Sequence, residues 1–154
     1  MSEVAAALSA WAPEAASQLE EVESLAAGVS GRVGQLARLR IAWLLGGAGA
    51  LERQRPSALA AGLDEQTVAA IGRWTTSPLF DGTDRACLAL AEQFVIDVSG
   101  VTDADVDAVL QRLGPSSLYG FVQTLWAADM AGRMRLALGA VLSGDAGVDE
   151  GSGK

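Results

Sequence analysis

Apolar residues recur at intervals of three and four along nearly the whole chain, which is the period of an α-helix. The segment 84–98 shows this pattern well, because one helical face would carry Cys87, Leu90, Ala91, Phe94 and Val98. No segment shows the alternation of apolar and polar residues that is typical of a half-buried strand. The sequence therefore predicts an all-α fold.

Proline, glycine and capping residues divide this pattern into helices. Pro13 suits the first turn of a helix. Asp64 is predicted to cap a short helix over 65–73, and Thr102 with Asp105 forms a pattern typical of a capping box. Further helices are expected over 30–45, 84–98 and 116–142.

The segment GGAGA, residues 46–50, indicates a break after the helix over 30–45. Pro56 follows soon afterwards, and a proline inside a helix costs about 3 kcal/mol. We therefore expect the next helix to begin near Arg55, leaving 46–54 as a loop or a separate turn.

Charge and composition exclude several classes of function. The chain of 154 residues, 15.8 kDa, has 11 basic and 19 acidic residues and a net charge of −8. Nucleic acids and anionic membrane surfaces would repel it, so neither is an expected partner. The chain has no histidine and one cysteine, Cys87. This excludes an intramolecular disulfide, a zinc site of the Cys/His type and a histidine that acts as a general base. We expect no metal and no cofactor.

No targeting signal or membrane-spanning segment is apparent. The N-terminus is acidic where a secretory signal would be basic. Apolar stretches are interrupted well short of the ~20 residues that a membrane-spanning helix needs. A cytoplasmic protein is therefore expected.

Three segments resemble the carboxymuconolactone decarboxylase and alkylhydroperoxidase D family. They are LARLRIAWLLGG (36–47), SALAAGLDEQTVAAI (57–71) and SPLFDGTDRACLALAEQFV (77–95). The resemblance implies a single domain of about seven helices with the helical-hairpin core of that family, and assembly into a homo-oligomer. We expect an N-terminal helical extension over 1–28, the family-like domain over 29–142 and a flexible tail over 143–154.

The chemistry of the peroxidase branch of that family is missing from this chain. The branch uses a CxxC motif, a Glu ahead of it and a His one helical turn after it. These positions fall on residues 47–50, Gln35 and Gln54, which carry no thiol, carboxylate or imidazole. Cys87 lies on an apolar face, where a structural role is the expected one. The resemblance therefore excludes a thiol peroxidase at this site.

Three other residues are candidate catalytic groups. Asp129 falls on the apolar stripe of the last helix, where a carboxylate is costly unless it is paired. It is either a general acid or base or the partner of Arg133 four residues later. Glu52 is either a relocated carboxylate or part of a solvated charge cluster, and Tyr119 either donates to a ligand or packs with its hydroxyl at the surface.

Five residues are candidates for binding a small organic molecule. Gln35, Gln54 and Arg55 would orient it, while Trp43 and Trp126 would line its pocket or simply pack. Two function classes follow. The first is thiol-independent acid-base chemistry of the lyase or isomerase type on such a molecule. The second is a catalytically inactive oligomeric binding or scaffold protein with the same fold.

Overall fold

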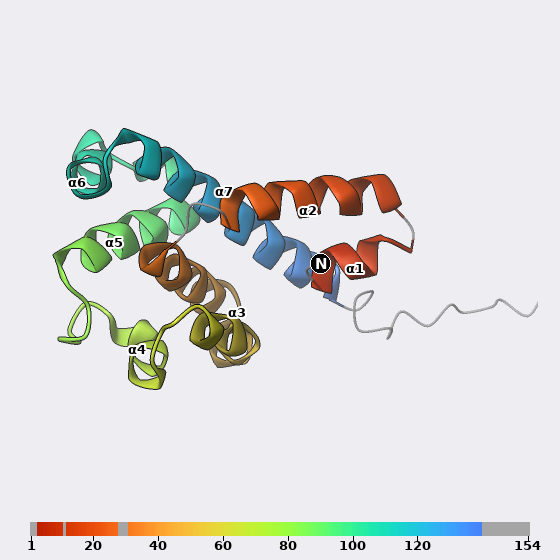
Figure 1. Cartoon of the computed structure of the whole chain (residues 1–154), viewed down its shortest axis with the longest axis horizontal. Helices are drawn as coiled ribbons and strands as arrows, with labels where there is room; N and C mark the ends of the chain where they lie inside the picture. The colour runs from red at the N-terminus through yellow and green to blue at the C-terminus, as the bar shows by residue number, and fades with distance from the viewer. Residues whose placement is uncertain (1–2, 11, 28–30, 140–154) are drawn as a thin grey trace, which may run out of the picture.

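The computed structural model describes residues 3–10, 12–27 and 31–139, and all regular structure in these ranges is helical (Figure 1). The helices are α1 (Glu3–Leu8), α2 (Pro13–Ala27), α3 (Arg32–Ala60), α4 (Glu65–Ala70), α5 (Gly82–Ile96), α6 (Asp103–Leu113) and α7 (Pro115–Ala137), with two 3₁₀ turns, η1 (Ile71–Arg73) and η2 (Val98–Gly100). The expected all-α fold is confirmed. The expected domain boundary at 28/29 and the tail over 143–154 lie outside the described residues.

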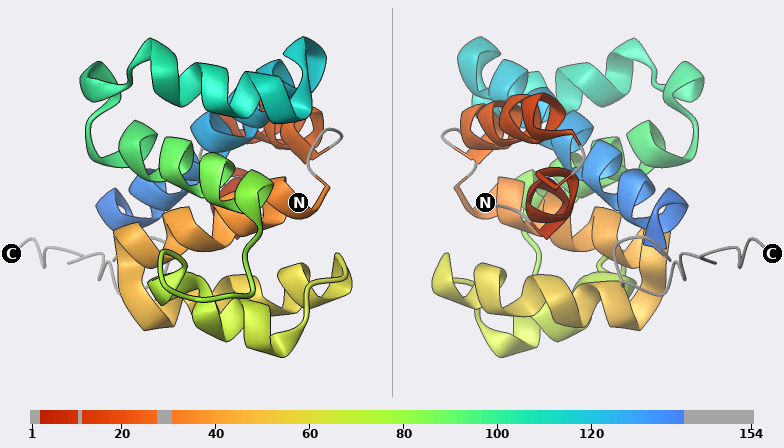
Figure 2. Two further views of the ribbon diagram at one scale, coloured as in Figure 1. Left: turned by 90° about the vertical axis from the view of Figure 1, so that its left-hand side faces the viewer. Right: turned by 90° about the vertical axis from the view of Figure 1, so that its right-hand side faces the viewer.

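Helix α3 consists of two arms that meet at Gly47. The residue has φ 60° and ψ −150°, a conformation essentially restricted to glycine. The first arm covers residues 32–46 and the second covers 48–60. Figure 2 shows the second arm running back alongside the first, and side chains from both arms share one buried cluster. The break predicted at the glycines is therefore real, and it forms a helical hairpin.

The expectation that a helix begins near Arg55 was wrong. Residues 48–54 are already helical, and Pro56 lies inside the second arm. A proline there leaves the carbonyl of Glu52 without its helical donor. Glu52 and Pro56 are both exposed, so water can satisfy that carbonyl. Burial of Leu51 and Ala58 on the other side of the arm offsets the remaining cost.

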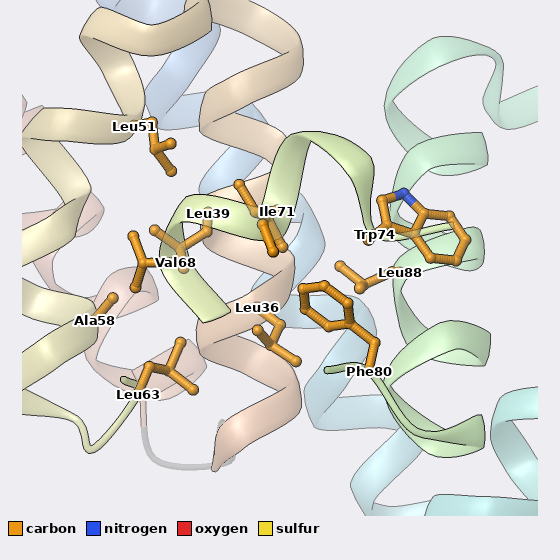
Figure 3. Packing of buried hydrophobic residues seen from close by; sticks show 11 residues of the cluster. Leu36, Leu39, Leu51, Ala58, Leu63, Val68, Ile71, Trp74, Phe80 and Leu88 are labelled. Atoms are coloured by element: carbon orange, nitrogen blue, oxygen red, sulfur yellow. The ribbon is translucent and has the colours of Figure 1, made fainter. Parts of the chain in front are cut away.

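The first arm of α3 is the central helix of the molecule, because it is apolar on two sides. Leu36 and Leu39 face a cluster formed with the second arm, α4, η1 and α5, which we call the hairpin cluster (Figure 3). Ala37 and Ile41 face a second cluster, with α5, α6 and α7. The hairpin cluster comprises Leu36, Leu39, Leu51, Ala58, Leu63, Val68, Ala70, Ile71, Trp74, Phe80 and Leu88.

Helices α1 and α2 cover one side of α7 (Figure 1). Buried Ala5 and Leu19 pack there with Leu8, Met130 and Met134. α2 begins at Pro13 in the first turn, as expected. The last helix begins at Pro115 and is described to Ala137, while the expected final residues 140–142 lie outside the described part.

The capping residues set most helix starts where the sequence predicts them. The Asp64 carboxylate accepts from the Thr67 amide and from the Thr67 hydroxyl, both at 2.8 Å, and these two hydrogen bonds lower the Asp64 pKa. Thr102 and Asp105 form the expected capping box. Two of the expected helices differ in their bounds. The helix expected over 65–73 becomes 3₁₀ from Ile71, and the helix expected over 84–98 starts at Gly82 behind an Asp81 cap and ends at Ile96.

Two arginines hold the connector between η1 and α5. Arg85 donates to the carbonyls of Thr75, Ser77 and Phe80 at 2.7, 2.6 and 3.1 Å. Arg32 donates to both carboxylate oxygens of buried Asp84, and its pKa is raised mainly by that hydrogen bond. Asp84 thus holds the start of α5 against α3, and Arg85 holds it against the connector.

The Gly47→Ala variant tests whether the hairpin depends on the glycine conformation. A side chain at Gly47 has space but requires a strained backbone, so we expect a loss of about 1–3 kcal/mol in the free energy of unfolding. Urea denaturation followed by circular dichroism measures this loss. Gly49→Ala is the matched control, because Gly49 has negative φ within the second arm, and it should be neutral or slightly stabilising. Equal stability of the two variants would contradict the role given to Gly47.

Candidate functional site

The residues that the resemblance aligns with the CxxC motif, 47–50, lie at the turn of the hairpin. Residues 48–50 begin the second arm, so their backbone amides stand at a helix N-terminus, which is where a thiolate pKa would be lowered. Their side chains are alanine and glycine. The placement therefore matches what the resemblance implies, while the reactive groups are missing.

Gln35 and Gln54 lie at different distances from this turn along the two arms of α3. Gln35 is half-buried near the start of the first arm, twelve residues before Gly47, which is about 18 Å along a helix. Gln54 is exposed in the second arm, seven residues after Gly47, about 10 Å along it. Gln54 is also four residues after Ala50, so it lies one helical turn beyond residues 47–50, where the resemblance places the histidine, whereas Gln35 lies well before the turn.

Asp129 is held in an ion pair. Its carboxylate is 19% exposed and accepts from Arg133 Nε at 2.8 and 2.9 Å. Arg133 also donates through Nη2 to the Val95 carbonyl at 2.9 Å, and its pKa is raised mainly by the hydrogen bond to Asp129. The pair therefore joins α7 to the end of α5, which is the structural alternative foreseen for Asp129.

Glu52 and Arg55 form a second closed cluster at the surface. Arg55 Nη1 lies 3.1 Å from Glu52 Oε1, and Nη2 donates to Glu65 on α4. The hydrogen bond with Glu65 is the main reason that the Arg55 pKa is raised. The arginine thus links the second arm of α3 to α4.

Two of the three candidate catalytic residues, Tyr119 and Asp129, lie apart on one helix. Tyr119 is 69% exposed on α7, ten residues before Asp129, or about 15 Å along the helix. Glu52 belongs to a different helix. The sequence pattern placed Asp129 on a buried stripe, but Val122 and Leu136 of that stripe are exposed.

The two candidate tryptophans have different surroundings. Trp43 is partly buried against the hairpin cluster and lies over Gly72, where an added Cβ would come within 3.0 Å of its ring. Trp126 is 48% exposed on α7. Trp43 therefore packs, whereas Trp126 faces outward.

Sequence reasoning missed one polar cluster that joins three elements. Arg40 of α3 lies 3.2 Å (Nε) and 3.1 Å (Nη2) from Glu92 Oε2 of α5, and the Trp74 indole donates to the same oxygen at 2.9 Å. Arg40 also donates to the Ile71 carbonyl. The side chains of Arg40 and Glu92 are 9% and 29% exposed. The available signal was an arginine between the apolar residues Leu39 and Ile41.

Cys87 is buried, as expected. Burial, with a smaller contribution from Asp84, raises the pKa of its thiol to about 12. The thiol is therefore neutral at physiological pH and a poor nucleophile.

The residues that the structure describes contain neither a candidate metal cluster nor a membrane-spanning helix. Within them, no group of three or more His, Cys, Asp or Glu side chains is placed to hold a metal ion. None of their helices combines the length and apolar character needed to cross a membrane.

The Glu92→Ala variant tests how strongly the Arg40 cluster stabilises the fold. It would leave the buried Arg40 guanidinium without a counter-charge, so we expect a loss of about 3 kcal/mol in the free energy of unfolding. Glu92→Gln keeps an oxygen acceptor and should lose less. Asp107→Ala, an exposed carboxylate on α6, is the control and should change little. A Glu92→Ala protein as stable as the control would show that the cluster contributes nothing.

Comparison with known proteins identifies the fold. No protein-family model matches the sequence, and no curated protein matches it. The structure is similar to the crystal structure of an Agrobacterium tumefaciens protein of unknown function, described as a candidate antioxidant defence protein AhpD. The TM-score is 0.76 at 20% identity, over 84% of this chain and 90% of that one. The chain therefore has an alkylhydroperoxidase D-like fold, as its sequence resemblance implies.

Proposed function

We propose that this chain is a catalytically inactive, oligomeric binding or scaffold protein built on the alkylhydroperoxidase D-like fold. The observation that carries the proposal is that both candidate carboxylates already pair with arginines of the same chain. Asp129 binds Arg133, and Glu52 binds Arg55. Each pair lies within one helix, and its arginine also contacts a second helix, so both carboxylates have a structural role that requires no substrate.

The backbone at the hairpin turn supports the same proposal. In the resembling family the first reactive cysteine stands where this chain has Gly47. The φ of 60° and ψ of −150° at Gly47 disfavour every residue with a Cβ. The backbone conformation therefore disfavours a cysteine at position 47, in addition to the absence of thiol side chains at residues 47–50.

The absence of thiol chemistry can be measured directly. We expect the purified protein to consume no hydroperoxide with a dithiol reductant, because its one thiol is buried and neutral. The double variant Gly47→Cys/Ala50→Cys should stay inactive and unfold at lower urea concentration, whereas Ala50→Cys alone should unfold like wild type. Turnover that survives Cys87→Ser would contradict the proposal.

A second candidate function keeps acid-base chemistry of the lyase or isomerase type on a small organic molecule. Glu92 favours it, because Arg40 and Trp74 bind only one oxygen in the bonds described above and the side chain still meets solvent. A carboxylate held in this way is a better candidate base than Asp129.

Kinetics would separate the two carboxylates once a substrate is found. If Glu92 is the general base, Glu92→Gln should lower turnover by about 10²-fold or more. Asp129→Asn should then leave turnover unchanged. If Asp129→Asn lowers turnover and Glu92→Gln does not, Asp129 is the general base.

A further inference from the structure

Helices α1 and α2 are attached to the rest of the described chain mainly through α7 (Figure 1). Ala5 of α1 and Leu19 of α2 are buried in this contact. On α7 they pack with Met130 and Met134, which are partly buried. This small cluster is separate from the two clusters around the first arm of α3. We call α1 and α2 together the N-terminal strap, and its removal would leave both larger clusters intact.

The N-terminal strap has little stability of its own. α1 has only six residues, and helices of this length are marginal in water. The sequence from residue 3 to residue 27 contains five glutamates and no basic residue, so no ion pair can form within the strap. Its order therefore depends on a few side chains packed on α7. Regions with so few buried apolar contacts open at a lower free energy than the core does.

The α7 face beneath the strap suits the exchange of one helix for another. Met130 and Met134 are four residues apart, so they lie on the same side of α7. They are two of the three methionines of the chain. Methionine is unbranched and flexible, and its thioether repacks around partners of different shape. The face can therefore accept another apolar helix in place of the strap.

The charges on the two sides of this contact are opposite. Residues 130–137 of α7 contain Arg133 and Arg135 and no acidic residue. Arg133 is paired with Asp129, so Arg135 in the last turn gives this end of α7 its net positive charge. The strap that covers it carries only negative charge. A helix that takes its place should therefore combine an apolar stripe with acidic residues.

We propose that the N-terminal strap is a displaceable, autoinhibitory cover. It detaches from α7 as one unit while the rest of the fold stays intact, and an acidic amphipathic helix of a partner protein then binds the face formed by Met130 and Met134. The inference rests on the proposed function, since it names the surface that a binding protein would present. Strap and partner helix occupy the same place, so they compete.

Hydrogen exchange of the full chain, followed by mass spectrometry, tests the detachment. In wild type, the protected amides of the strap should exchange at least about tenfold faster than those in the first arm of α3. Leu19→Ser should speed exchange in the strap further and leave the first arm unchanged. Leu79→Ser is the matched control, because Leu79 is 39% exposed on the connector, and it should alter neither region. Strap amides that exchange as slowly as the first arm would overturn the proposal, as would a Leu19→Ser variant that speeds both regions equally.

Peptide binding tests the competition. The probe is a fluorescent synthetic peptide of residues 3–27, because it carries the required apolar and acidic residues. Fluorescence anisotropy should show tighter binding to full-length Leu19→Ser than to wild type. Apparent affinity follows the fraction of open molecules, so the gain should equal the factor by which Leu19→Ser speeds strap exchange, while the open state remains a minority.

Charge reversal on α7 tests the nature of the partner. In the Leu19→Ser background, Arg135→Glu should weaken peptide binding by at least about threefold, because it replaces attraction by repulsion. Arg53→Glu makes the same change of charge at an exposed position of the second arm of α3, and it should have no effect. Equal effects of the two substitutions would overturn the assignment of an acidic helix to this face.

The outcomes separate the strap from the function beneath it. Equal peptide affinity for wild type and Leu19→Ser overturns autoinhibition, and no binding to either overturns the docking face. Both results leave the proposed loss of catalysis standing. Hydroperoxide turnover that survives Cys87→Ser would instead overturn the proposed function, while the exchange measurement would still decide whether the strap detaches.

Discussion

The reversal of α3 at Gly47 is the constraint on which the rest of the fold depends. It lets one helical segment pack against itself, so that Leu51 and Ala58 of the second arm reach Leu36 and Leu39 of the first. The first arm then packs against a buried cluster on each of two sides, and α4, α5 and α7 lie around it (Figure 2). A conformation open only to glycine thus organises helices distant from it in sequence.

Local signals in the sequence predicted the helices but not the pairs between them. Asp64 and Thr102 cap helices because their partners lie three residues away. Pro56 misled the prediction, because burial of the second arm outweighs a missing helical hydrogen bond. The partners of Arg40 and Arg133 lie 52 and 38 residues away, and only the folded chain brings such groups together. The candidate site was therefore less predictable than the fold.

The segment that carried the family resemblance proves to hold the fold together. In DGTDRACLALAE, Asp84 binds Arg32, Arg85 holds the connector, and Glu92 binds Arg40. These residues serve packing and orientation, so they can remain recognisable after reactive groups have been replaced. A resemblance carried by such residues is evidence for the fold and says little about the reaction.

The placement of charge leads to the same conclusion about function. The carboxylates of Asp129 and Glu52, which acid-base catalysis would use, are paired with arginines. The one thiol, Cys87, is neutral within an apolar cluster. Among the described residues, Trp126 of α7 is a large aromatic side chain that is 48% exposed to solvent. These pairings fit the proposed inactive binding or scaffold protein better than an enzyme that would use Asp129 or Glu52 as a base.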